Sequence, residues 1–124
     1  MLKNCTPHPI HLLLGVNTRV TIPSAVQSAR VEVSRTKIAD LSLAALGVEH
    51  NAAIYRAAYG QVSGLPPAEE GLFLVVSRMV AEASPHRTDL LVPEDTVRDE
   101  EGNIVGCRGF AVFSPNAVAR WKAT

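Results

Sequence analysis

The apolar run from Leu72 to Val76 is the sequence feature that most constrains the fold. Five consecutive apolar residues leave no polar face, so a strand built from them must be covered on both sides. We therefore expect a central strand of a sheet here. Apolar residues between Val76 and Ala83 then recur at helical spacing, which predicts a short helix that ends before Pro85.

Several other segments have the composition or alternation of strands. Val31 and Val33 alternate with polar side chains in residues 29–35, the pattern of a half-buried antiparallel strand. Further strands are expected at 10–14, 18–22, 53–59 and 90–92, and in a hairpin from 96 to 110. The strand at 90–92 is expected to stop at Pro93.

Apolar spacing and glycines predict helical segments and one irregular strand elsewhere in the chain. Ile38, Leu41 and Ala45 fall at helical spacing, which predicts a short helix at about 38–46 that ends at Gly47. A last helical turn is expected at 116–122. Two glycines, at 106 and 109, interrupt the second strand of the hairpin, so we expect a bulge or a close approach to the backbone there.

These elements predict an α+β fold in which residues 1–124 form a single compact domain. The sheet is expected to be mostly antiparallel, with one or two short helices. A chain of this length can bury a core without disulfides. Its two cysteines, Cys5 and Cys107, are too few for a disulfide scaffold and are expected to be reduced thiols.

Charge and hydropathy argue against several classes of partner. Twelve basic side chains balance twelve acidic ones, so no general attraction to a nucleic-acid polymer or a membrane is expected. No apolar segment approaches the roughly 20 residues of a membrane span, and the first residues lack the apolar stretch of a signal peptide. These observations predict a cytoplasmic protein.

The spacing of three residues near the N-terminus suggests a metal site. Cys5, His8 and His11 are three apart and would share one side of a polyproline-type segment, but a zinc site needs further ligands. The alternative is a capped turn in which Thr6 bonds a nearby backbone group. We expect that turn, with no metal and no cofactor.

Ser77 follows a strand and opens a helix, as a catalytic nucleophile can. The Gly-x-Ser-x-Gly motif of such an elbow is absent, and an N-cap explains Ser77 more simply. Arg108 could lower the pKa of the Cys107 thiol, but no motif supplies a base. We expect no catalytic residue.

Polar residues next to the predicted strand ends suggest a binding site for an anion. Arginines outnumber lysines nine to three, and guanidinium groups suit two-pronged contacts with phosphate. If these side chains converge beside the start of the helix after Val76, they form a pocket for a nucleotide. The alternative is a set of surface ion pairs, such as Arg87 with Asp89. The candidate ligand-binding residues are Thr6, His8, Ser77, Arg78, Arg87, Arg98 and Arg108.

Four segments resemble motifs of a loose group of small bacteriophage and prophage proteins. They are Asn4-Cys5-Thr6-Pro7-His8, Gly64-Leu65-Pro66, Val76 to Ala83, and the hairpin from Val97 to Gly109. The resemblance leaves residues 36–53 without a counterpart. It implies a phage-type accessory protein in the host cytoplasm. Small phage proteins often bind host proteins or sequester host signalling nucleotides, which can counter host defence.

Three functional hypotheses follow. The first is sequestration, without catalysis, of a small anionic ligand such as a linear or cyclic nucleotide. The second is an inhibitor or assembly factor that acts by protein–protein binding. The third is a small hydrolase that uses His8 or His86 as a base. A homo-oligomer fits the first two, because unpaired sheet edges tend to pair with each other.

Overall fold

The structure is a computed structural model that describes residues 1–25 and 27–123. Its elements, in chain order, are β1 (Leu2–Asn4), β2 (Ile10–Leu14), β3 (Thr18–Ile22), β4 (Arg30–Ser42), a 3-10 turn (Ala44–Leu46), β5 (Asn51–Ser63), β6 (Phe73–Val75), α1 (Arg78–Glu82), β7 (Leu90–Arg98), β8 (Ile104–Ala111) and α2 (Pro115–Lys122). They form two compact units. We call the described residues of Met1–Val31 and Val62–Thr124 the sheet unit, and Glu32–Gln61 the ribbon.

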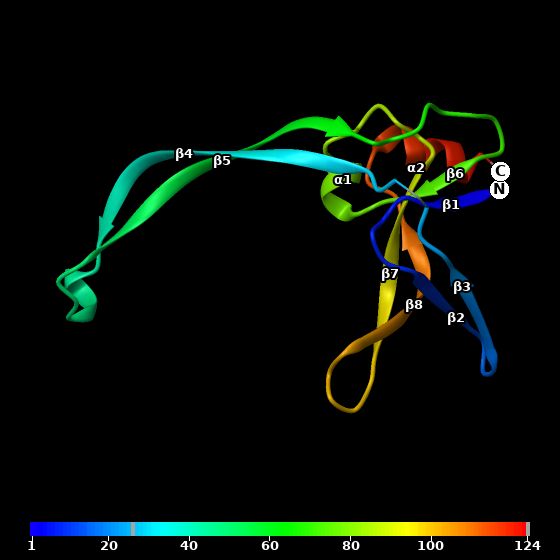
Figure 1. Ribbon diagram of the computed structural model, residues 1–124, viewed down its shortest axis with the longest axis horizontal. Coiled ribbons are helices and arrows are strands. Elements are labelled where there is room, and N and C mark those ends of the chain that lie inside the picture. Colours follow the sequence, from blue (N-terminus) through cyan, green and yellow to red (C-terminus); the bar gives the residue numbers. More distant parts are fainter. Residues whose placement is uncertain (26, 124) are drawn as a thin grey trace. The chain divides into compact units, whose positions relative to one another are not determined.

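The sheet unit is built on one six-stranded sheet in the order β1-β6-β7-β8-β2-β3 (Figure 1). The pairs β2–β3 and β7–β8 are antiparallel hairpins, whereas β6 runs parallel to both β1 and β7, and β2 runs parallel to β8. The prediction of a sheet-rich fold with one or two short helices is confirmed, since the described residues form α1 and α2. The six-stranded sheet is mixed, however, since it combines the antiparallel hairpins with parallel pairs at β1–β6, β6–β7 and β2–β8. The reason is that β1, β6 and β7 are joined by long connections rather than by tight turns.

The apolar run around β6 is the centre of the main core, as predicted. Leu74, Val75 and Val76 have no exposed surface, and Leu74 and Val76 pack with Cys5, Val80 and other buried residues. The Val76 N–H donates to the carbonyl oxygen of Leu91 at 2.9 Å. Strands on both sides satisfy the backbone of this run, so its apolar side chains can be buried on both faces.

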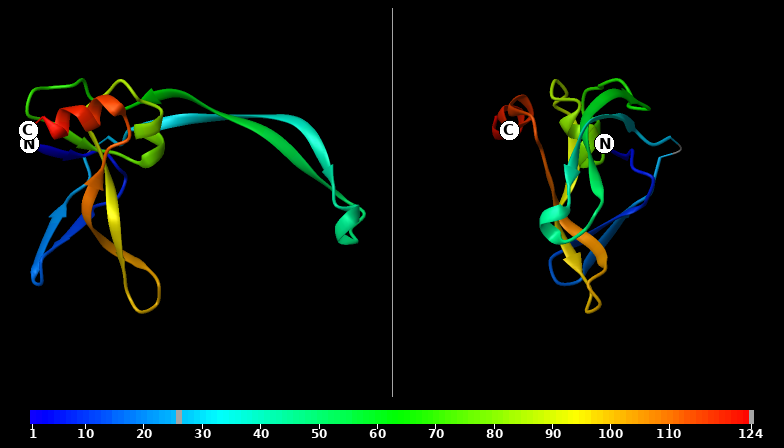
Figure 2. Two further views of the ribbon diagram at one scale, coloured as in Figure 1. Left: turned by 180° about the vertical axis from the view of Figure 1, so that it is seen from behind. Right: turned by 90° about the vertical axis from the view of Figure 1, so that its left-hand side faces the viewer.

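A second, smaller core lies where the two hairpins meet. Leu12 of β2 is opposite Cys107 of β8, and both pack with Ile22. A Cβ added to Gly106 would lie 2.7 Å from the carbonyl oxygen of His11, which confirms the close approach predicted at this glycine. A Cβ added to Gly109 would meet open space. Beyond this contact the hairpins separate toward their turns (Figures 1 and 2).

Both helices lie at the end of the sheet that holds β1, β6 and the start of β7 (Figure 2). Ser77 caps α1, where its Oγ accepts from the Val80 N–H at 3.3 Å. Ser114 caps α2 in the same way, through the Ala117 N–H at 3.0 Å. The ring of Trp121 packs 4.8 Å from that of Phe73, which attaches α2 to the sheet. The predicted helices after Val76 and at the C-terminus are therefore confirmed.

The predicted helix at 38–46 is wrong. β4 continues as a strand to Ser42, and only the 3-10 turn that follows is helical. β5, confirmed over a longer span than the predicted 53–59, supplies partners for the β4 backbone. Gly47 ends the 3-10 turn with a φ of 77°, the left-handed conformation expected of a C-terminal glycine.

The prediction that a strand stops at Pro93 is also wrong, because β7 runs through it to Arg98. β6 pairs with β7 only at Leu90 and Leu91, so one side of β7 is an edge from there on. A proline is tolerated on such an edge because its missing N–H removes no ladder hydrogen bond. Within the described residues, no helix has both the length and the apolar composition to cross a membrane.

Candidate functional site

The first candidate residues, Thr6 and His8, lie in a turn organised by Asn4. The Asn4 side chain is 1% exposed. Its Nδ2 donates to the carbonyl oxygens of His8, at 2.8 Å, and Ile22, at 3.1 Å, while its Oδ1 accepts from the Thr6 N–H and hydroxyl. The predicted capped turn is confirmed, since the Thr6 hydroxyl also lies 2.9 Å from the carbonyl oxygen of His8. The Asn-x-Thr-Pro-His segment thus has a structural role.

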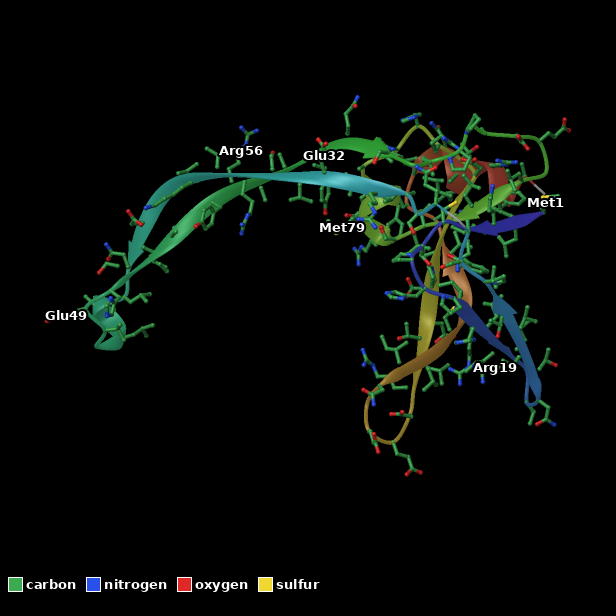
Figure 3. The ribbon with its side chains drawn as sticks, in the orientation of Figure 1. Met1, Arg19, Glu32, Glu49, Arg56 and Met79 are labelled. Carbon is green, nitrogen blue, oxygen red and sulfur yellow. The ribbon has the colours of Figure 1, made fainter. Side chains whose placement is uncertain are left out.

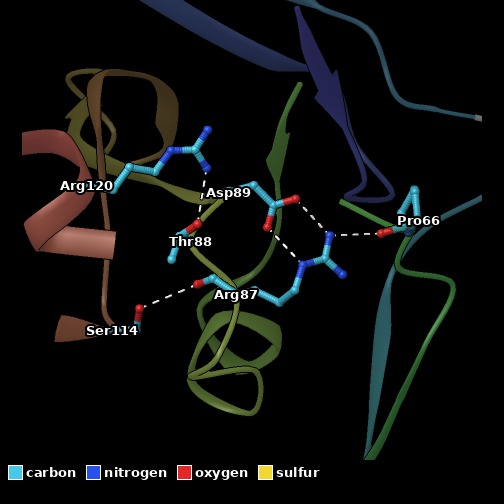
Figure 4. A network of polar contacts seen from close by, with 6 residues as sticks. All are labelled: Pro66, Arg87, Thr88, Asp89, Ser114 and Arg120. Carbon is cyan, nitrogen blue, oxygen red and sulfur yellow. Dashed lines mark hydrogen bonds and ion pairs between the residues drawn. The ribbon is translucent and has the colours of Figure 1, made fainter. Parts of the chain in front are cut away.

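Arg87 is held inside the fold by a buried partner. Its Nε and Nη2 contact the two carboxylate oxygens of Asp89, at 2.9 and 2.7 Å, and Nη2 also donates to the carbonyl oxygen of Pro66 (Figure 4). Burial by itself raises the pKa of Asp89, but the hydrogen bond and charge of Arg87 outweigh it, so the pKa lies below its usual value. The ion pair of Arg87 with Asp89, expected on the surface, therefore exists but is buried.

The same network attaches α2 to this part of the chain. Arg120 of α2 donates to the Thr88 hydroxyl at 3.1 Å, and the Ser114 hydroxyl lies 3.4 Å from the carbonyl oxygen of Arg87 (Figure 4). Arg87, Thr88 and Asp89 thus connect the loop at Pro66 with the start and body of α2. These contacts have a structural role, because they hold α2 and the Pro66 loop to the same part of the sheet unit.

The other three arginines lie at separate places and have partners nearby. Arg78 donates to Glu82, one turn along α1, at 2.9 Å. Arg98 donates to the carbonyl oxygen of Gly102 within the β7–β8 turn at 2.7 Å. Arg108 of β8 is exposed, and its Nη1 lies 3.9 Å from Asp95.

Strand geometry keeps Arg98 away from the start of α1. Leu91 is the last β7 residue that pairs with β6, the strand that leads to α1. Arg98 lies seven residues further along β7, which corresponds to roughly 23 Å at the rise of an extended strand. The structure therefore does not bring the arginines at 78, 87, 98 and 108 around one hollow. Ligand binding by the individual residues stays a prediction.

One hollow does bring together two of the predicted residues. Thr6 and Ser77 line a cavity of about 390 Å³, with Pro7 and Val80 as apolar walls. Ser28 and Arg30 also line it, and neither was among the predicted site residues. The Arg30 guanidinium is exposed and has no hydrogen bond or ion pair to a described residue. Spacing could not have identified Arg30, because it is distant in sequence from both Thr6 and Ser77.

The cysteine and histidine residues at the N-terminus do not form a cluster. Cys5 is buried in the main core, His8 is exposed, and the His11 ring lies 3.0 Å from the Thr21 hydroxyl. No group of three His, Cys, Asp or Glu side chains suited to a metal ion occurs in residues 1–25 and 27–123. Burial raises the pKa of both Cys5 and Cys107, which disfavours the reactive thiolate.

The ribbon carries a different kind of surface. Within Glu32–Gln61, which the structure describes completely, Leu43 is half-buried and every other residue is exposed. Side chains stand on both faces of the paired strands (Figure 3). Eight large apolar side chains are between 39% and 77% exposed. They are Val33, Ile38, Leu41, Leu46, Val48, Ile54, Tyr55 and Tyr59.

Alternation along the strands assigns the aromatic residues to one face of the ribbon. Tyr55 and Tyr59 are four residues apart in β5, so their side chains share a face. The Arg35 guanidinium of β4 lies 5.2 Å from the centre of the Tyr55 ring and belongs to that face as well. We call Arg35, Tyr55 and Tyr59 the tyrosine face. Its signal in the sequence is the spacing of the two tyrosines, four apart in the strand predicted at 53–59. The helix predicted at 38–46 hid the pairing of that strand with β4.

Comparisons of the chain with family models, with curated proteins and with solved structures gave no match.

Proposed function

We propose that this chain is a non-catalytic binding protein that docks its ribbon against another protein chain. The observation that carries the proposal is the group of eight exposed apolar side chains within one 30-residue hairpin. Many exposed apolar side chains on one hairpin favour an interaction site, because their exposure to water is unfavourable. Protein interfaces are also enriched in tyrosine and arginine, which meet here on the tyrosine face.

The charge of the ribbon favours a protein partner over a nucleic acid. Arg35, Lys37 and Arg56 balance Glu32, Asp40 and Glu49, so the ribbon has no net charge. A β-ribbon that binds nucleic acid needs a positive excess to neutralise phosphates. A neutral surface with exposed aromatic rings suits a protein surface of mixed composition.

Site-specific photo-crosslinking tests this proposal. A benzoylphenylalanine is placed at position 59 of the ribbon and, as a control, at position 16, where Val16 is 96% exposed in the β2–β3 turn. We expect protein adducts from position 59 and far fewer from position 16. Equal yields at the two positions, or no adduct from the ribbon, would contradict the proposal.

A second candidate function is sequestration of a small anionic ligand in the hollow beside α1. The observation that favours it is Arg30, whose guanidinium has no partner among the described residues and which lines the hollow together with Ser28 and Ser77. The hollow falls within the usual size range of ligand pockets, about 300–1,000 Å³.

Thermal shift with linear and cyclic nucleotides, and with inorganic phosphate, tests the second candidate. A ligand at one hundred times its dissociation constant should add about 2.7 kcal/mol of stability. Arg30→Ala should remove the shift, whereas Arg19→Ala, which changes an exposed arginine of β3, should keep it. An absence of any shift, or an equal loss in both variants, would count against this function.

A further inference from the structure

We infer that the partner of the ribbon is a second copy of this chain, and that the two copies join edge to edge along β5. The inference rests on the proposed function and names its partner. β4 and β5 form a two-stranded sheet, so each has one edge that the described residues of that sheet leave unpaired. Such an edge presents a row of backbone N–H and C=O groups to another strand.

The two edges differ in how they are protected. β4 carries five charged residues in thirteen, and charged side chains are the usual means of preventing edge pairing. β5 has the same length and carries one charge, Arg56, with no proline. The sequence therefore blocks the β4 edge and leaves the β5 edge open.

The β5 sequence is complementary to itself in one antiparallel register. A two-fold axis at Ala57, the middle of Asn51–Ser63, places Tyr55 opposite Tyr59 of the second copy. The same register places Ile54 opposite Gly60, and Arg56 opposite Ala58. The tyrosines thus form two aromatic cross-strand pairs, and Ile54 and Arg56 each face a small residue. No like charges lie directly opposite each other.

The stability of a two-stranded ribbon supports the same pairing. A two-stranded hairpin is marginally stable in water, and three or more strands with an apolar face are needed for independent stability. Pairing of two β5 edges makes a four-stranded sheet. Each copy contributes the thirteen residues of β5 to the new strand pair. Because the ribbon is neutral, two copies do not repel each other.

Cysteine substitution tests the register directly. In Ala57→Cys, the two new thiols face each other across the axis, at a separation that a disulfide can span. In the control Ala53→Cys, residue 53 faces Gln61 of the second copy, so its thiols lie far apart. We expect a covalent dimer under mild oxidation for Ala57→Cys and a monomer for Ala53→Cys. Equal cross-linking of both variants, or none of either, would overturn the pairing.

Sedimentation equilibrium of the unmodified chain tests self-association without a new thiol. We expect a monomer–dimer equilibrium in which Ala57→Lys raises the dissociation constant by about tenfold or more, because two like charges meet at the axis. Thr36→Lys on β4 should leave the constant unchanged, and circular dichroism should show both variants folded. A monomer at every concentration overturns the inference. If position 59 then cross-links to a different protein, the proposed function stands and only the second copy is excluded.

Discussion

Arg87 and Asp89 form a two-pronged ion pair in which Nε donates to Oδ1 at 2.9 Å and Nη2 donates to Oδ2 at 2.7 Å. The Asp89 side chain is 3% exposed and that of Arg87 is 15% exposed, so water contributes little to solvating either charge. Removing one partner of such a pair leaves the other charge buried and uncompensated. We expect Asp89→Asn to destabilise the fold by about 3 kcal/mol at neutral pH.

The loss from Asp89→Asn should depend on pH. Arg87 holds the pKa of the Asp89 carboxyl below its value in the unfolded chain, about 3.9. A depressed pKa contributes stability that is fully present above the unfolded value and is lost as the pH falls through the folded value. Urea unfolding of both proteins at neutral and acidic pH should therefore show a stability difference that shrinks on acidification. A difference of constant size would contradict this account.

The second prediction concerns Asn4, whose buried side-chain amide both donates and accepts hydrogen bonds. Asn4→Ala would leave the carbonyl oxygens of His8 and Ile22 without their amide donor. We expect a loss of about 3 kcal/mol in the free energy of unfolding, since unsatisfied buried groups keep their full desolvation cost. Thr6→Val removes one half-buried hydroxyl and should cost about 1 kcal/mol. A smaller loss for Asn4→Ala than for Thr6→Val would contradict the assigned role of Asn4.

The strands were largely predictable because their signals are local. The apolar run at Leu72–Val76 predicts a buried strand whatever surrounds it, and the alternation of Val31 and Val33 predicts β4. The wrong helix at 38–46 comes from a coincidence of spacing. Ile38 and Leu41 are three apart, so a strand points them to opposite faces, and on an exposed two-stranded ribbon neither face must be apolar.

The site was less predictable because convergence is a property of the fold. Arg87 and Asp89 are two residues apart, and their pairing could be considered from sequence. Its burial could not, since it depends on the loop at Pro66, 21 residues away. Arg30 joins Ser77 at one hollow only because β4 begins beside the turn that follows β1. No local pattern contains that information.

The two glycines of β8 give a matched pair for the third prediction. A Cβ at Gly106 would lie 2.7 Å from the carbonyl oxygen of His11, and backbone cannot move aside cheaply. Gly109 lies three residues further along the same strand with open space around its Cβ position. We expect Gly106→Ala to lower the free energy of unfolding by about 2 kcal/mol and Gly109→Ala to change it little. Denaturant unfolding checks both, and equal effects would show that β2 and β8 do not approach as described.

The fourth prediction is that the two cysteine thiols react very slowly in the folded protein. Cys5 and Cys107 are 1% and 3% exposed, and burial raises the pKa of each thiol, so little thiolate forms at neutral pH. We expect both thiols to react with a disulfide reagent only as fast as the chain opens, so that their rates rise together with denaturant. Val16→Cys, at a position 96% exposed in the wild type, should add one fast-reacting thiol under the same conditions. Fast labelling of Cys107 without denaturant would mean that the β2–β3 and β7–β8 hairpins separate in the native state and uncover the core between them.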